Sequence, residues 1–245
     1  MIGRFLAAIQ FLTVIPVTCE TGPLGAAGVW FPLVGAMLGA SAGAVLLVSQ
    51  SGLGVSIGAL LALVWLLMLT GCLHEDGLAD VADAVRAGRS RQKMMEILKD
   101  SRIGTYGAVT LVVSTALRWQ ALARSPANPI PGIAAALALS RSSLVALAGL
   151  TPSVGTGMGQ AFAASCSGAA MIATTVESIL VVGALAFFTG WRTGAAMIVS
   201  SAAIVLLARF WFLRRLGGVN GDCLGATCQV VEIVNLLILA CQPSI

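Results

Sequence analysis

The sequence predicts an all-α polytopic integral membrane protein: a helix bundle with about seven transmembrane helices and one short interfacial helix. Of its 245 residues, 58% are hydrophobic and only 10% are charged, and the mean hydropathy is +0.97. Such apolarity exceeds what a soluble domain needs for its core. The apolar runs are near the length of about twenty residues that a spanning helix needs. Helices are expected there because lipid leaves no partner for free backbone groups.

The first element expected along the chain is a short helix within the stretch MIGRFLAAIQFLTVIPVT, residues 1–18. The stretch has the basic start and apolar centre of a signal peptide but no small-residue cleavage pattern, so we expect it to be retained. An interfacial or re-entrant helix that ends near Pro16 is the better interpretation.

Seven apolar runs then predict the transmembrane helices. They cover residues 29–49, 54–73, 106–123, 130–150, 169–190, 193–213 and 225–241. No internal repeat and no linker divides them, so residues 1–245 are expected to form a single membrane-embedded domain. The six cysteines form no C-x-x-C pair and lie mostly in or beside apolar runs, which indicates neither a zinc site nor a disulfide framework.

The basic residues near the ends of the spans predict the orientation. With the loop 74–105 in the cytoplasm, the N-terminus lies inside and the C-terminus outside. The basic residues then on the inside are Arg4, Arg86, Arg89, Arg91, Lys93, Lys99, Arg102, Arg214 and Arg215, and those near the outer ends are Arg118, Arg124 and Arg192. The net charge of +4 is too small to predict nucleic-acid binding.

Charge is concentrated in residues 71–107, which hold six of the ten carboxylates, the only histidine and six of the fourteen basic residues. Asp76, Asp80 and Asp83 are spaced i, i+4, i+7. If the second span continues as a helix to a stop at Gly88, all three carboxylates project from one face. Like charges on one stripe repel each other unless a cation lies among them, and oxygen ligands favour Mg²⁺. The alternative is a solvated helix extension whose acids pair with an arginine such as Arg86.

Two further elements follow in the same loop. The stretch SRQKMMEILKD carries Met94, Met95, Ile97 and Leu98 on a narrow apolar stripe, as in a helix that lies on the membrane surface. In DSRIGTYG, the residues Asp100, Ser101 and Arg102 precede two glycines, a pattern that suits a phosphate-binding turn. A plain turn before a span favours the same residue types.

A second polar cluster, RRLGGVNGDCLGATCQVVE, lies between the sixth and seventh spans. It falls on the same predicted side as the first cluster, so the two can meet. One helical face carries Asp222, Gln229 and Glu232. Glu232 is predicted to lie so deep in the last span that its carboxylate would be out of contact with bulk water. Arg141, in the middle of the fourth span, suits either a counter-charge for a carboxylate or a phosphate ligand.

Carboxylates followed by a basic stretch suit a divalent metal bound to a phosphorylated substrate. The sequence contains no P-loop and no G-x-G-x-x-G that opens a βαβ unit, and its two G-x-S-x-G matches, at residues 39–43 and 54–58, lie in apolar runs rather than at a strand-to-helix turn. Hydrolase, kinase and dinucleotide functions therefore have no support. The inferred reaction class is metal-dependent phosphoryl transfer at the cytoplasmic face of the membrane.

Six motifs, in order and nearly from end to end, resemble a known family. They are FLTVIP, WFPLVGAMLG, HEDGLADVADA, DSRIGTYG, ALSRSS and LGGVNGDCLGA. The chain is similar to the cobalamin synthases, the adenosylcobinamide-GDP ribazoletransferases of bacterial cobalamin biosynthesis. The H-x-D-G-L-A-D-x-x-D and D-S-R-x-G-T-x-G blocks together are a specific signature of that family.

The resemblance implies Mg²⁺-dependent transfer of the adenosylcobinamide phosphate moiety of adenosylcobinamide-GDP to α-ribazole or its 5'-phosphate, with release of GMP. It implies a multi-pass protein of the bacterial cytoplasmic (inner) membrane whose active site faces the cytoplasm. It leaves open a homo-oligomer and association with other enzymes of cobalamin assembly. The expected catalytic and metal-binding residues are Asp76, Asp80 and Asp83, with Asp222 as a further metal ligand. The residues expected at the substrate are His74, Arg86, Lys99, Asp100, Ser101, Arg102, Arg141, Asn220 and Glu232.

The chain departs from the family pattern at two positions. Glu75 stands where the family leads us to expect an apolar residue, and Gln229 where it leads us to expect another glutamate. The second departure leaves Asp222 the better metal candidate on the last helix, and Glu75 has no role in this scheme.

Two other functions compete. Membrane phosphotransferases that join CDP-activated groups to alcohols share aspartates on a helix, but they use a D-G-x-x-A-R core, and this chain has Asp80 where that arginine would fall. In a cation-coupled transporter, Glu232 and Arg141 would line the path, but such proteins often show paired repeats and broken helices, and the sequence shows neither clearly.

Overall fold

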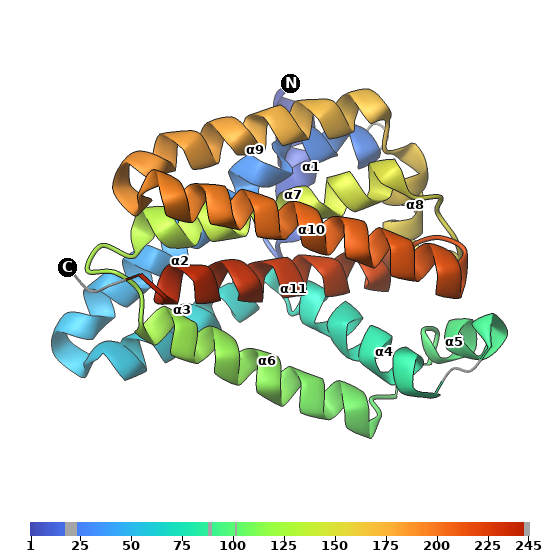
Figure 1. Cartoon of the computed structure of the whole chain (residues 1–245), viewed down its shortest axis with the longest axis horizontal. Coiled ribbons are helices and arrows are strands. Elements are labelled where there is room, and N and C mark those ends of the chain that lie inside the picture. Colours follow the sequence, from blue (N-terminus) through green and yellow to red (C-terminus); the bar gives the residue numbers. More distant parts are fainter. Residues whose placement is uncertain (18–23, 88–89, 101, 243–245) are drawn as a thin grey trace.

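The computed structural model describes residues 1–17, 24–87, 90–100 and 102–242 of the chain. These residues form a helical bundle without a strand; the one β-type contact among them is an isolated parallel bridge between Ser153 and Val219 (Figure 1). The elements in chain order are α1 (Ile2–Leu12), η1 (Leu24–Trp30), α2 (Phe31–Leu53), α3 (Val55–Thr70), α4 (Leu73–Ala87), α5 (Arg91–Ile97), α6 (Thr105–Ala123), α7 (Ile130–Leu150), α8 (Met158–Ser165), α9 (Gly168–Thr189), α10 (Trp191–Leu216) and α11 (Gly221–Ala240).

The predicted class, a polytopic helix bundle, is confirmed. Five helical segments of the described chain are long and apolar enough to cross a membrane, and the bent pair α3–α4 makes a sixth when it is counted as one span. Each of the seven predicted ranges coincides with a helix. Helix α6, which coincides with the predicted range 106–123, is not among the helices that are both long and apolar enough to cross a membrane. It nevertheless packs alongside α11 in the bundle.

Helix α7 lies at the centre of the bundle. It is the most enclosed of the candidate spans, since 78% of the residues in its most apolar stretch are buried. Its neighbour α2 presents Gly35, Gly39 and Gly43 at intervals of four residues, and the backbone of α7 lies directly against all three. A Cβ atom on Gly39 would come within 2.5 Å of the Ile133 carbonyl oxygen. Small residues at this spacing let two helices approach closely in a membrane, so this glycine stripe fixes the α2–α7 contact.

The second predicted span does not continue as one straight helix, and this part of the prediction was wrong. Helix α3 ends at Thr70, Gly71 adopts a left-handed conformation with φ 59°, and Cys72 follows with φ 57°. The axis turns by 89° between α3 and α4. A glycine in the left-handed conformation is a common helix terminator, and here it redirects the chain so that α4 packs along α11. The predicted stop at Gly88 lies outside the described residues.

Helix α5 also differs from its prediction as a helix that lies on the membrane surface. Met94 and Leu98, half of its apolar stripe, are 1% and 8% exposed and belong to the protein core. The helix packs on α4 and α10, with Arg215 of α10 beside the Met94 sulfur. At least half of the stripe is therefore buried against protein.

The ends of several elements converge at one end of the bundle, at the right in Figure 1. The α10–α11 junction, α5 and the start of α8 all lie there. The residues 152–154 are tied to this junction by hydrogen bonds between Val154 N and Val219 O, and between Val219 N and Pro152 O, each 2.9 Å long. The bundle thus gathers polar segments that are far apart in sequence.

Candidate functional site

The two polar clusters of the sequence meet where α4 crosses α11. A Cβ atom on Gly77 would lie 2.9 Å from both the Cα and the carbonyl oxygen of Asp222, and one on Gly225 would lie 3.3 Å from the His74 Cα. Glycine at both positions allows this approach because no side chain separates the two backbones. The crossing brings the HEDG and NGD segments together, as their predicted common side requires.

Four carboxylates surround this crossing. Asp76 is exposed, and Asp80, Asp83 and Asp222 are partly buried. Asp80 is close enough to the other three to feel their charge. No lysine or arginine in the described ranges forms an ion pair with Asp76, Asp80 or Asp222. The cluster therefore carries repulsion that a bound cation would relieve.

Arg86 does not neutralise these carboxylates. Its Nε donates to the Tyr106 hydroxyl at 2.8 Å, and its guanidinium lies 5.5 Å from the centre of that ring. The pairing of Arg86 with the acids, which would make the stripe an ordinary solvated helix face, is therefore not formed.

Asp83 has a partner of a different kind. Its Oδ2 accepts a hydrogen bond from Gly104 N at 2.7 Å, and its Oδ1 accepts one from Gly107 N at 2.9 Å. These are backbone groups at the start of α6, where free N–H groups favour a carboxylate. A Cβ atom at Gly104 would come within 2.5 Å of Asp83 Oδ1. The two glycines of DSRIGTYG therefore admit Asp83, which joins α4 to α6.

The predicted phosphate-binding turn is held by a local ion pair. Arg102 Nη2 lies 2.7 Å from Asp100 Oδ2, and Arg102 Nε donates to Asp100 Oδ1 at 3.0 Å. Hydrogen bonds from the side chain and backbone of Arg102 lower the pKa of Asp100 to about 2, so the pair stays charged near neutral pH. Lys99 is exposed beside it, and Ser101 lies outside the described residues.

A cavity of about 640 Å³ opens beside the α4–α11 crossing. His74, Asp76, Asn220 and Asp222 line one part of it, and the residues 156–159 at the start of α8 line another. Asp80 and Asp83 are not among the lining residues, nor are Arg86, Lys99, Asp100 and Arg102. The cavity is within the size range of small-molecule sites.

Asp222 is fixed in position at this cavity. Its Oδ2 accepts from Asn220 Nδ2 at 2.7 Å, while Asn220 Oδ1 caps α11 by accepting from Cys223 N at 3.1 Å. Asn220 therefore has a clear structural role, and its predicted contact with substrate stays a prediction, although it lines the cavity.

The chemistry of these groups fits Mg²⁺ as a shared ion rather than as one caged by protein. Asp76 and Asp222 offer hard oxygen ligands on one cavity, and Mg²⁺ in phosphoryl-transfer sites is typically held by one or two carboxylates plus substrate phosphates. No group of three or more His, Cys, Asp or Glu side chains within the described ranges could hold a metal ion by itself. The predicted set of four aspartates is thus not assembled as a complete protein cage.

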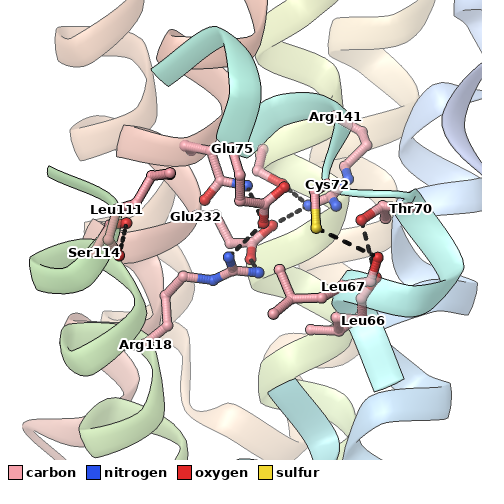
Figure 2. Close-up of polar contacts among 12 residues, drawn as sticks. Leu66, Leu67, Thr70, Cys72, Glu75, Leu111, Ser114, Arg118, Arg141 and Glu232 are labelled. Atoms are coloured by element: carbon pink, nitrogen blue, oxygen red, sulfur yellow. Dashed lines mark hydrogen bonds and ion pairs between the residues drawn. The ribbon is translucent and has the colours of Figure 1, made fainter. Parts of the chain in front are cut away.

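Beneath the cavity lies a buried network of four charged side chains, drawn in Figure 2. Arg118 of α6 contacts Glu75 Oε1 of α4 at 2.5 Å and Glu232 Oε1 of α11 at 2.7 Å. Arg141 of α7 contacts the other oxygen of Glu232. All four are less than 9% exposed, and their formal charges cancel, as buried ions require.

Polar neighbours complete this network. Gln229 Nε2 donates to Glu75 Oε1 at 2.9 Å, and Arg141 Nη1 donates to Ser140 Oγ at 2.7 Å. Arg141 therefore takes the first of its two predicted roles, as a counter-charge. Neither Arg141 nor Glu232 lines the cavity, and their predicted contact with substrate stays a prediction.

The sequence prediction missed the role of Arg118 and found none for Glu75. Arg118 was counted among charges near the outer ends of spans, but it is 2% exposed and ion-paired inside the bundle. One signal in the sequence could have found it: Glu75 and Glu232 on predicted helices need two buried cations, and Arg141 supplies only one.

His74 lies between the network and the cavity. It is 2% exposed, and neither of its ring nitrogens has a hydrogen-bond partner among the described residues. Buried polar atoms are seldom left in this state, so His74 is the lining residue whose polar atoms most need a ligand.

The chain matches the family described as cobalamin-5-phosphate synthase over residues 4–240. It is 36% identical over 244 residues to an adenosylcobinamide-GDP ribazoletransferase of Vibrio cholerae, covering 96% of this chain and 92% of the relative. Relatives of the same name from Bradyrhizobium diazoefficiens and Escherichia coli are 37% and 34% identical, over 98% and 96% of this chain and 94% and 98% of their own. No solved structure matches the chain.

Proposed function

Because the chain belongs to the cobalamin-5-phosphate synthase family, we propose that it is the membrane transferase that assembles the nucleotide loop of cobalamin. The substrates are adenosylcobinamide-GDP and α-ribazole or α-ribazole 5'-phosphate, and the products are GMP and adenosylcobalamin or its 5'-phosphate. Family membership supports the enzyme class, and the assignment of residues to the reaction is inferred from the site.

One observation carries the assignment of the site: Asp76 and Asp222, from motifs far apart in sequence, line the same cavity. Their convergence through the Gly77–Asp222 contact supports a reaction centre at the α4–α11 crossing. Asp76 and Asp222 would hold Mg²⁺ together with oxygens of the substrate diphosphate. When bound there, Mg²⁺ neutralises negative charge on the diphosphate.

The transfer exchanges one phosphorus–oxygen bond for another. The acceptor hydroxyl oxygen bonds to the phosphorus on the cobinamide side, the bond from that phosphorus to the bridging oxygen breaks, and GMP leaves with that oxygen and its electron pair. The hydroxyl proton passes to a carboxylate near the cavity. Asn220 holds Asp222 of α11 in place, and Asp83 holds α4, which bears Asp76, against α6. These contacts would keep Asp76 and Asp222 in fixed positions for the reaction.

The decisive test is Mg²⁺-dependent release of GMP by purified membranes given adenosylcobinamide-GDP and α-ribazole 5'-phosphate. Asp76→Asn should reduce turnover by at least a hundredfold while the protein is expressed and inserted normally, because the amide is a poor metal ligand. Glu96→Gln is the matched control: it removes an exposed carboxylate of α5 that contacts only its helix neighbours Lys93 and Gln92, and turnover should be unchanged. Near-normal turnover by Asp76→Asn would overturn the assignment.

The competing functions are not favoured by these findings. The same membranes, given CDP-diacylglycerol and an alcohol acceptor, should form no product, whereas a CDP-alcohol phosphotransferase would. Ion-driven uptake of unmodified substrate into proteoliposomes would instead indicate a transporter.

A further inference from the structure

Residues 156–159 form a second wall of the cavity, and two of these four residues are glycines. The residues 155–159 read Gly-Thr-Gly-Met-Gly, and Gly155 and Gly157 have φ values of +81° and +103°. Gly157 is the N-cap of α8, and no side chain caps that helix. The first N–H groups of a helix have no partner within the helix, so this wall offers hydrogen-bond donors where most helices have a capping side chain.

A second helix begins beside the first. Gly159 of α8 and Gly221 of α11 touch backbone to backbone: a Cβ atom on Gly221 would lie 3.3 Å from the Gly159 Cα. Gly157, Met158, Gly159, Gly221 and Asp222 all line the cavity. The N-terminus of α8 therefore lies against that of α11. The α8 terminus has no capping side chain, so its partial positive charge favours an anion, whereas α11 is capped by Asn220 and carries Asp222 in its first turn.

An independent observation points to a ligand at the same cavity. His74 lines it, is 98% shielded from solvent, and has two ring nitrogens without a partner among the described residues. A buried imidazole without a partner is costly, and a ligand oxygen in the cavity could accept from its N–H group. Neither the helix termini nor the carboxylates account for this residue.

The charges of the two walls are opposite. Asp76 and Asp222 would repel a bare anion, whereas the uncapped N-terminus of α8 attracts one, so a phosphate is expected nearest α8 and a cation nearest the carboxylates. We infer that the loop 155–159, the N-terminus of α8 that it leads into, and His74 bind the phosphate oxygens of a nucleoside diphosphate group. This inference rests on the proposed function for its choice of ligand.

The test adds negative charge to this wall without harming the fold. Thr156 and Met158 are exposed and line the cavity, and an acid at either position improves the α8 N-terminus. Thr156→Glu and Met158→Asp should each weaken GDP binding at least tenfold in the purified full-length protein, measured by calorimetry with EDTA and again with Mg²⁺. The melting temperature should stay the same or rise.

The matched control is Ser167→Asp. Ser167 caps α9 by accepting from Ala170 N and does not line the cavity, so the same charge at another helix start should leave GDP affinity unchanged. His74→Phe should also weaken GDP binding, by a smaller factor than Thr156→Glu, because it removes a neutral donor. Wild-type GDP affinity in both folded acidic variants would overturn the inference.

The outcomes separate this inference from the proposed function. If the wild-type protein binds GDP through this wall but releases no GMP in the transfer assay, the proposed function fails and the phosphate site stands. If transfer proceeds and both acidic variants retain the wild-type KM for adenosylcobinamide-GDP, the phosphate site fails and the function stands.

Discussion

Glu75 and Gln229 stand at the two positions where the family resemblance led us to expect other residue types, and the structure places them in contact. Gln229 Nε2 donates to Glu75 Oε1, and the same oxygen accepts from Arg118. A carboxylate on either residue could pair with Arg118. The four formal charges of the buried network cancel with a single carboxylate at this contact, and in this chain α4 supplies it.

This interpretation predicts a rescue. Glu75→Leu leaves two buried arginines with only Glu232, and Gln229→Glu adds a third buried carboxylate, so each single variant should lose about 3–5 kcal/mol of stability. The double variant restores neutrality and should recover most of the loss. Thermal unfolding of the four proteins in detergent micelles measures the coupling. A double variant whose loss equals the sum of the single losses would show that the two residues are independent.

Asp83 shows that spacing alone does not reveal the partners of a carboxylate. Its i+7 position after Asp76 places it on the same face of α4, but its two oxygens already accept hydrogen bonds from Gly104 and Gly107. The role of a carboxylate depends on which donors surround it, and those donors belong to another helix. Its assignment as a metal ligand stays a prediction.

At the scale of elements, the α2–α7 contact depends on glycine rather than on hydropathy. Gly39→Ala would place a Cβ atom 2.5 Å from a backbone oxygen of α7. Since this backbone oxygen cannot move aside without a shift of the whole helix, we expect Gly39→Ala to lower the free energy of unfolding by about 1–3 kcal/mol.

The same helix provides the control for this prediction. No atom outside the local backbone lies within 4 Å of a Cβ built on Gly52, so Gly52→Ala should be neutral or slightly stabilising, as expected for alanine in a helix. Melting temperatures of the two variants in the same detergent decide the question. Equal stability of both would show that the glycine stripe is incidental.

Helices themselves were predictable, and the break between α3 and α4 was not. Each predicted range coincides with a helix because an apolar run near twenty residues is a local signal. Gly71 within a span is ambiguous, since glycine is tolerated inside membrane helices. In the structure Gly71 ends α3, and the turn that follows lets Gly77 of α4 pack against the backbone of Asp222.

At the scale of the whole molecule, we propose that the end bearing the cavity faces the cytoplasm. Arg214 and Arg215 in the last turn of α10 and the basic residues of α5 lie near that end, and such residues favour the inner side. The C-terminal end of α11, at Ala240, lies at the opposite end of the bundle in Figure 1.

This orientation predicts the behaviour of fusions to the full-length chain. Alkaline phosphatase fused after Ile245 should be active in the periplasm, and a fluorescent protein fused at the same position should not fluoresce. A reporter inserted after Ser90, between α4 and α5, should behave in the opposite way. Phosphatase activity of the fusion at Ser90 would reverse the topology and place the active site outside.

The sequence by itself determined the class of the protein, the location of its helices and the segments that carry its chemistry. Those properties follow from local composition, because hydropathy sums along a run and a motif lies in one stretch of chain. Only the tertiary structure decided which charges line the cavity and which are buried counter-charges. Arg118 and Glu75 are 43 residues apart in the chain, and Asp76 meets the Asp222 segment only through two glycines. Burial of an ion requires a partner in space, and sequence spacing does not specify which distant partner the packing of helices will supply.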